Sequence, residues 1–237
     1  MNLILFSATD LVAPGRLLLT DARARHVQRI LKARPGDEVR VGEIDGRIGR
    51  GRLLTVAGDR IELAVELYCS PPASLPLILL LALPRPKVLR RTLAAAVTMG
   101  VKQIFVFNAF RVEKSYWQSP RLEAGALRET ALEALAQAGD TLLPEIHLRS
   151  RFRPFVEDEL PQLAAGRNAL LFHPDARFPS LSCTPSLPAL AAIGPEGGFI
   201  PFEVSLLQQA GLRPVSFGPR ILRVEQVVPA LIGRFSA

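Results

Sequence analysis

Residues 189–203 read ALAAIGPEGGFIPFE, and this stretch decides the fold class of the second part of the chain. An apolar run, Ala189–Ile193, leads into a bend with three glycines, and Pro201–Ala210 then has the apolar spacing of a helix that stops at Gly211. A buried strand that passes through a glycine-rich bend into a helix is typical of α/β proteins. The stretch therefore predicts an α/β domain in which a glycine-rich loop at the end of a strand could bind a ligand.

The same alternation of strands and helices extends outward from this stretch. Continuous apolar runs, typical of parallel strands buried on both faces, occur at Leu77–Leu83, Ile104–Phe107, Ala169–Phe172 and Val215–Phe217. Helical spacing occurs at Lys87–Met99, Leu122–Ala138 and Val224–Phe235. Pro229 lies inside the last of these patterns, so that helix either kinks there or begins near it. We expect one α/β domain with a mainly parallel sheet over residues 74–237.

The first seventy residues have a different pattern, in which apolar and polar residues alternate. Strands separated by turn residues are predicted at Asp37–Val41, Arg47–Val56 and Arg60–Leu67. A helix is predicted at Thr20–Ala33, with Val27, Ile30 and Leu31 on its apolar face. The proline-rich junction at residues 71–74 is stiff enough to separate two domains. Residues 1–70 are therefore predicted to form a small β-barrel with one helix.

Composition bounds the kind of partner and the compartment. The 237 residues are 49% hydrophobic, enough for a sizeable core, and carry a net charge of +7, which favours a polyanionic partner. The two cysteines, Cys69 and Cys183, have no metal-binding spacing, so we expect no metal and no disulfide. No signal peptide is recognisable, and the most apolar run, Leu75–Leu83, contains Pro76 and is too short to span a bilayer. We expect a cytosolic protein that does not enter a membrane.

Two late loops have residues suited to binding chemistry. In the first, Ile193–Phe199, glycines allow the backbone to approach a ligand closely, and Glu196 places a charge among backbone amides. The second, Phe217–Glu225, also leaves a strand end and contains two arginines that could contact phosphate or developing negative charge. Plain turns without a ligand are the alternative for both. Neither loop matches the phosphate-binding GxxxxGK[ST] motif or the dinucleotide-binding GxGxxG motif.

IGPEGGF at Ile193–Phe199, followed by FGPRILRVE at Phe217–Glu225, resembles the signature of the RsmE-type family of ribosomal RNA (uracil-N3) methyltransferases, which belong to the SPOUT superfamily. The resemblance covers nearly the whole chain. HVQRIL at His26–Leu31 followed by Gly36-Asp37 is similar to the segment that opens the family's amino-terminal barrel. Further similar segments are Leu83–Lys87 and Met99–Val101.

The resemblance implies a fold and an activity that periodicity alone does not. It implies a SPOUT-type parallel sheet with a carboxyl-terminal trefoil knot, preceded by a PUA-like β-barrel that binds RNA, and a homodimer. It also implies methylation of N3 of a uridine in small-subunit (16S) ribosomal RNA, with S-adenosylmethionine as the cofactor. The residues expected to bind the cofactor are Phe172, His173, Ile193, Gly194, Pro195, Gly197, Gly198, Phe217, Gly218, Ile221, Leu222 and Val224.

Catalytic and RNA-binding residues are expected on the same basis. Arg223 is the candidate electrostatic partner of the uracil, Glu196 is expected to organise its loop by accepting N–H bonds, and Glu225 is a weaker candidate for orienting Arg223. Trp117 could stack on a base, although loop anchoring is favoured. The basic residues expected to contact RNA are Arg23, Arg25, Arg29, Lys32, Arg34, Arg85 and Lys87.

Three functional hypotheses follow. The first is the methyltransferase. The second is a non-catalytic RNA-binding paralogue with a degenerate cofactor pocket, favoured because Val224 and Gln226 stand where the family has the threonines of RTETA. The third is a nucleotide-dependent oxidoreductase, against which the absence of GxGxxG argues.

Overall fold

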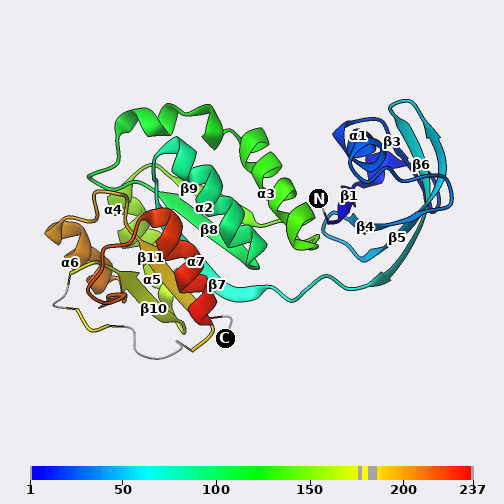
Figure 1. Ribbon diagram of the computed structural model, residues 1–237. Helices are drawn as coiled ribbons and strands as arrows, with labels where there is room; N and C mark the ends of the chain where they lie inside the picture. Colours follow the sequence, from blue (N-terminus) through cyan, green and yellow to red (C-terminus); the bar gives the residue numbers. More distant parts are fainter. Residues whose placement is uncertain (1, 176–177, 181–185, 236–237) are drawn as a thin grey trace. The chain divides into compact units, whose positions relative to one another are not determined.

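The computed structural model describes residues 2–175, 178–180 and 186–235 (Figure 1). The chain divides into two compact units, Met1–Ala73 with Leu132–Leu143, and Ser74–Ala131 with Pro144–Ala237. The first segment ends at Ala73, within the proline-rich stretch of residues 71–74, and residues 132–143 group with it. No helix of the described residues is long and apolar enough to cross a bilayer.

The first unit is built on one mixed sheet of six strands in the order β1-β4-β5-β6-β3-β2. β1 is parallel to β4, and the other neighbours are antiparallel. One helix, α1 (Ala22–Arg29), contributes Ala24 and Val27 to a core that also includes Phe6, Leu53 and Leu63. The strands are β1 (Ile4–Phe6), β2 (Leu11–Ala13), β3 (Arg16–Leu19), β4 (Glu38–Glu43), β5 (Ile48–Ala57) and β6 (Arg60–Cys69).

The three longer strands of this sheet were predicted, but the end of α1 was predicted wrongly. The helix stops at Arg29, and Ile30 and Leu31 are 68% and 46% exposed rather than buried beside Val27. The reason is local, because Lys32 adopts a positive φ of 52° and turns the chain away from the helix axis. β1, β2 and β3 were not predicted, since three or four residues are too few to show alternation.

Arg23 joins three parts of the first unit. Its guanidinium lies 2.6 Å from a carboxylate oxygen of Asp10 and 2.7 Å from one of Asp21, and it donates to the Leu5 carbonyl at 2.8 Å. Burial alone would raise the pKa of Asp10, but hydrogen bonds from Arg23 and Ser7, with the Arg23 charge, outweigh it and lower that pKa. The donors of Arg23 are therefore used inside the unit.

We expect Asp10→Asn to lower the free energy of unfolding by about 1–2 kcal/mol at pH 7, because a charge-assisted bond to Arg23 is weakened. A carboxyl whose pKa is lowered by folding contributes stability above its unfolded value, 3.8, and this contribution is lost as the pH falls through the folded value. Urea unfolding at several pH values should therefore show the difference between variant and wild type shrinking below about pH 3.8. A difference that is constant with pH would contradict this account.

The second unit has a sheet of six strands in the order β12-β10-β11-β7-β8-β9, and every neighbouring pair is parallel. Of the two central strands, β11 is buried along its whole length and β7 is buried from Leu77 onward, with Leu79–Leu81 and Ala189–Ala192 essentially inaccessible to solvent. The strands are β7 (Leu75–Ala82), β8 (Val101–Phe107), β9 (Glu145–Arg149), β10 (Asn168–Phe172), β11 (Ala189–Ile193) and β12 (Arg213–Val215). The predicted parallel α/β domain is confirmed.

Helices cover this sheet, and α2 packs beside α7 (Figure 1). The longer helices are α2 (Pro86–Thr98), α6 (Pro201–Gln209) and α7 (Val224–Phe235). A fourth, α3 (Ala124–Ala138), begins in this unit, and its residues from Leu132 onward group with the first unit. Short helical turns cover Lys114–Gln118 (η2), Pro120–Leu122 (η3), Phe152–Pro154 (α4), Phe155–Glu159 (η4) and Leu160–Ala164 (α5). α7 begins at Val224 and continues through Pro229, so the alternative of a helix that begins near Pro229 is wrong.

Two further sequence predictions differ from the structure. The last strand ends at Val215 rather than Phe217, and the Phe217 ring stacks on Phe172 with centroids 4.9 Å apart. β9 was not predicted because it is a half-buried edge strand without a continuous apolar run. Cys69 is an exposed free thiol, and Cys183 lies outside the described residues.

Candidate functional site

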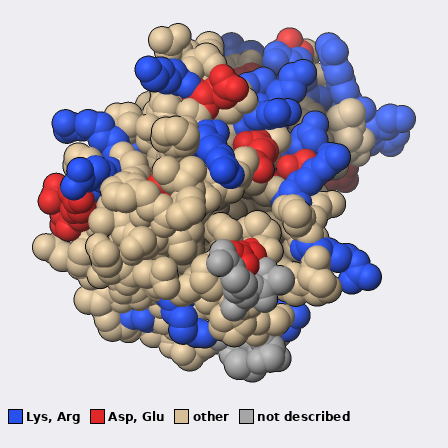
Figure 2. Space-filling view, turned by 90° about the vertical axis from the view of Figure 1, so that its left-hand side faces the viewer, with Lys and Arg blue, Asp and Glu red and all other residues tan. Residues whose placement is uncertain are grey.

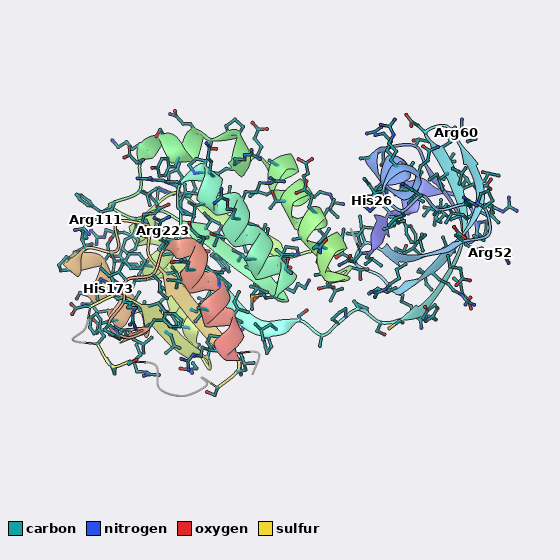
Figure 3. The ribbon with its side chains drawn as sticks, in the orientation of Figure 1. His26, Arg52, Arg60, Arg111, His173 and Arg223 are labelled. Atoms are coloured by element: carbon teal, nitrogen blue, oxygen red, sulfur yellow. The ribbon has the colours of Figure 1, made fainter. Side chains whose placement is uncertain are left out.

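The predicted loops lie around one cavity at the carboxyl ends of the parallel strands. β10, β11 and β12 end at Phe172, Ile193 and Val215, and the loops that follow meet at the same edge of the sheet. The cavity measures about 640 Å³, within the range of small-molecule sites. Figure 3 shows His173 and Arg223 at this end of the unit.

All twelve residues predicted to bind the cofactor line this cavity. Glu196, Arg223, Glu225 and Arg85 line it too, whereas Lys87 does not. Sequence reasoning missed four lining residues, and the only signal available for them was their position next to the predicted loops or in the first turns of α2 and α7. They are Val88, Pro174, Phe199 and Val227.

Both loops favour glycine, for different physical reasons. A Cβ atom at Gly194 would lie 3.2 Å from Cδ2 of Phe199, whose ring also lines the cavity. Gly218 has a φ of +101°, which residues with a side chain rarely adopt, although a Cβ there would meet no close neighbour among the described residues. The first loop thus uses glycine for space and the second uses it for backbone shape.

Glu196 is held by the start of α2. Its Oε1 accepts the backbone N–H of Arg85, the residue that precedes the helix, at 3.0 Å. A carboxylate at this position also complements the positive end of the helix dipole. Within its own loop, the Gly198 N–H donates to the Pro195 carbonyl at 2.8 Å and closes a turn. Glu196 therefore fastens the glycine loop to α2.

Two further lining residues, His173 and Arg223, supply an aromatic ring and a positive charge to the cavity. The His173 backbone N–H donates to the Val215 carbonyl at 3.0 Å, and its side-chain Nδ1 accepts the Asp175 N–H at 3.2 Å. Arg223 precedes α7, and its N–H donates to Oε1 of Gln226 at 3.1 Å. In the part of the chain that the structure describes, the Arg223 guanidinium has no acidic partner. Its charge is available to a ligand in the cavity.

A buried carboxylate that sequence reasoning missed braces the glycine loop. Glu203, which is 2% exposed, accepts the N–H of Phe110 at 2.6 Å and the N–H of Ile200 at 3.0 Å. Its place as the third residue of α6 is the usual one for an acid that bonds back to the residue before the helix. The position of Glu203 in α6 was the only signal in the sequence for its bond to Ile200, and no signal indicated its bond to Phe110.

We expect Glu203→Gln to lower the free energy of unfolding by about 1.5–3 kcal/mol, because the amide cannot accept both N–H bonds and would leave one donor buried. Thermal and urea unfolding of the full chain measure this effect. Glu225→Gln provides a control, since Glu225 is partly exposed in the first turn of α7. Equal stability of the Glu203→Gln variant and the wild type would show that this brace contributes nothing.

The basic residues predicted to bind RNA are all exposed except Arg23, which is held by two carboxylates. Arg25, Arg29, Lys32 and Arg34 are exposed in and after α1, whereas Arg23 is held by Asp10 and Asp21. Arg85 and Lys87 are exposed at the start of α2. Figure 2 shows basic side chains interspersed with broad uncharged areas on one face of the molecule. Trp117 anchors its loop, because its Nε1 donates to Asn108 Oδ1 at 2.9 Å.

Comparisons with known proteins agree with this architecture. A Treponema pallidum protein named ribosomal RNA small subunit methyltransferase E is 29% identical over 95% of this chain and 86% of its own. A Mycobacterium bovis protein of the same name is 24% identical over 98% and 91%. The solved structure of ribosomal RNA small subunit methyltransferase E from Neisseria gonorrhoeae, described as bound to S-adenosylmethionine, superposes with a TM-score of 0.77 at 22% identity, over 98% of this chain and 95% of the other.

Family matches cover both units. Residues 19–66 match the family described as the RNA methyltransferase PUA domain, which agrees with the predicted PUA-like module. Residues 71–236, more than half of the chain, match the family described as the RNA methyltransferase domain. On this match, which includes every loop of the cavity, the chain belongs to the RNA methyltransferase family.

Proposed function

We propose that this protein transfers a methyl group from S-adenosylmethionine to N3 of a uridine in small-subunit ribosomal RNA. The observation that carries the proposal is that the two glycine-bearing loops, Ile193–Phe199 and Phe217–Arg223, line one cavity at the ends of β11 and β12. The family match and the relatives named small-subunit methyltransferases support the same reaction.

The residues present fit the proposed cofactor. The Phe172–Phe217 ring pair and Ile193 offer apolar contact for a flat heterocycle, and the absence of a Cβ at Gly194 leaves the backbone open to polar ligand atoms. The cavity is large enough for a nucleoside-sized ligand. Bound S-adenosylmethionine would supply an electrophilic methyl group on a sulfonium. Holding both reactants in line provides much of the rate acceleration in such a transfer.

Arg223 is the proposed partner of the uracil. The N3 proton of uracil is only weakly acidic at neutral pH, so the site must favour its loss. A guanidinium beside the base stabilises the negative charge that develops on the ring and its oxygens. Glu196 has one carboxylate oxygen bound to the Arg85 N–H, so we assign it the role of positioning the loop.

Other parts of the proposal concern RNA and assembly. We propose that Arg25, Arg29, Lys32 and Arg34 contact the phosphate backbone through the first unit, because they are exposed close together in sequence. Arg85 and Lys87 are proposed contacts on the second unit, and Arg23 is left out because its donors are used by Asp10 and Asp21. A homodimer, a trefoil knot at the carboxyl end and a cytoplasmic location complete the proposal.

One observation favours the alternative, an RNA-binding paralogue without catalysis. Val224 and Gln226 replace two threonines of the family pattern, and Val224 is only 5% exposed. Gln226 accepts the Arg223 N–H at 3.1 Å, so the start of α7 keeps a side-chain acceptor despite the change.

Transfer of label from methyl-tritiated S-adenosylmethionine to unmethylated small-subunit ribosomal RNA, with nucleoside analysis of the product, tests the proposal. We expect 3-methyluridine at a single position. Free RNA and assembled subunits should be compared as substrates. Cofactor binding in calorimetry without any transfer to either substrate would support the paralogue instead.

A further inference from the structure

A large aromatic ring, Phe110, is left in solvent in the loop that follows β8. Phe110 is 74% exposed, although Ala109 and Val112 in the same loop are 2% and 8% exposed. The Val112 N–H donates to the Ala109 carbonyl at 3.0 Å and closes a tight turn around Phe110. The loop is thus buried at Ala109 and Val112, on either side of Phe110, while the Phe110 ring itself stays exposed.

The backbone of Phe110 is fixed from several directions. Its N–H is bound at 2.6 Å by Glu203, the buried carboxylate that also holds Ile200. The neighbouring Arg111 donates from Nη1 to the Gly197 carbonyl, and Asn108 accepts from Trp117 at 2.9 Å. A ring on a backbone held this way loses little conformational freedom when a ligand packs on it.

The loop that carries Phe110 lies beside the proposed active site. β8, which Phe110 follows, is parallel to its neighbour β7, so its loop lies at the same edge of the sheet as the cavity. A Cβ atom at Gly197, a cavity residue, would lie 3.0 Å from Cδ of Arg111, so the Arg111 side chain packs against the glycine loop. Figure 3 shows Arg111 and Arg223 at this end of the unit.

We propose that Phe110 is a stacking platform for a nucleobase of the RNA substrate, either the target uridine or its neighbour. The inference rests on the proposed function, because a base that reacts inside a cavity must leave its stack and gains from a new aromatic contact. Arg111, the next residue, is exposed and adds a cation suited to the RNA backbone. A contact with a second copy of the chain is the competing role, because Phe202, next to Glu203, is also 54% exposed, and the experiment below separates the two.

Three variants of the full chain separate ring stacking from other roles. Phe110→Ala removes the side chain, Phe110→Leu keeps apolar volume without a ring face, and Phe110→Trp keeps the face. Affinity for transcribed, unmethylated small-subunit ribosomal RNA is measured with S-adenosylhomocysteine bound, and methyl transfer is measured separately. We expect the Ala and Leu variants to lose about tenfold or more in RNA affinity and in kcat/KM for RNA, and the Trp variant to retain both. Cofactor affinity and thermal stability should be unchanged.

Each contrary outcome has a distinct meaning. RNA affinity of the Leu variant equal to that of the wild type would overturn stacking, while normal transfer would leave the proposed function intact. A change of oligomeric state in the Ala variant, seen by light scattering, would assign Phe110 to a contact between copies and overturn the platform. Wild-type protein that binds RNA through Phe110 but transfers no methyl group would sink the proposed function alone.

Discussion

Gly194→Val should reduce affinity for S-adenosylmethionine by at least about a hundredfold, the largest effect expected of any single change on cofactor binding. The added Cβ would already lie 3.2 Å from Cδ2 and 3.3 Å from Cε2 of Phe199, and the two methyl groups of valine extend further. Phe199 cannot move away freely, because its ring stacks on the buried Phe107 with centroids 6.1 Å apart. The valine must therefore displace the loop or occupy the cavity.

Calorimetric titration of the folded variant with S-adenosylmethionine measures this loss. Gly194→Ala should give a smaller loss, about tenfold, because only the first contact is made. Gly125→Val is the matched control, since Gly125 is exposed in α3 and a Cβ there meets no described atom within 4 Å. Cofactor affinity of Gly194→Val within about threefold of the wild type would mean that the cofactor binds away from this loop.

Gly218→Val tests the second loop by a different mechanism. Here space is open, and the strain comes from a φ of +101°, which a β-branched residue does not tolerate. Gly218→Ala should therefore be nearly as harmful as Gly218→Val, in contrast to the graded series at Gly194. This contrast in the same titration distinguishes crowding from backbone strain.

The cavity could be predicted from the sequence because its signals are local. Glycines at a strand end, as in Gly194 and Gly218, mark loops where the backbone needs space or an unusual φ, and parallel strands bring such loops to one edge. The family resemblance supplied the ligand. Phe199, the last residue of the first loop, was not among the expected cofactor residues because a buried aromatic residue looks like ordinary core.

Contacts between distant segments could not be predicted. The bond from the Phe110 N–H to Glu203 joins residues 93 positions apart, and no periodicity reports on it. Arg23 looked like the other basic residues around α1 until Asp10, thirteen positions earlier, was placed beside it. The prediction for the end of α1 was wrong for a different reason. Ile30 and Leu31 continue the apolar spacing of the helix, but the positive φ of Lys32 turns the chain away and leaves both side chains exposed.

Arg223→Ala should lower kcat for methyl transfer by about a hundred- to a thousandfold while leaving affinity for S-adenosylmethionine almost unchanged. Arg223 lines the cavity with no acidic partner in the described chain, so its charge is free to stabilise the uracil as N3 loses its proton. Arg223→Lys keeps the charge but not the planar pair of donors, and we expect an intermediate rate. Arg213→Ala, an exposed residue of β12 outside the cavity, is the matched control.

The pH dependence of kcat separates this role from a structural one. A cation beside the base lowers the pKa of N3 in the complex, so its removal raises that pKa and shifts the pH–rate profile upward. The deficit of Arg223→Ala should therefore shrink as the pH rises toward the pKa of free uridine. Arg220 also lines the cavity, and Arg220→Ala should lower kcat/KM without moving the profile if it only attracts RNA. A deficit of Arg223→Ala that is the same at every pH would assign Arg223 to the shape of its loop, because misplacement of the reactants slows transfer equally at all pH values.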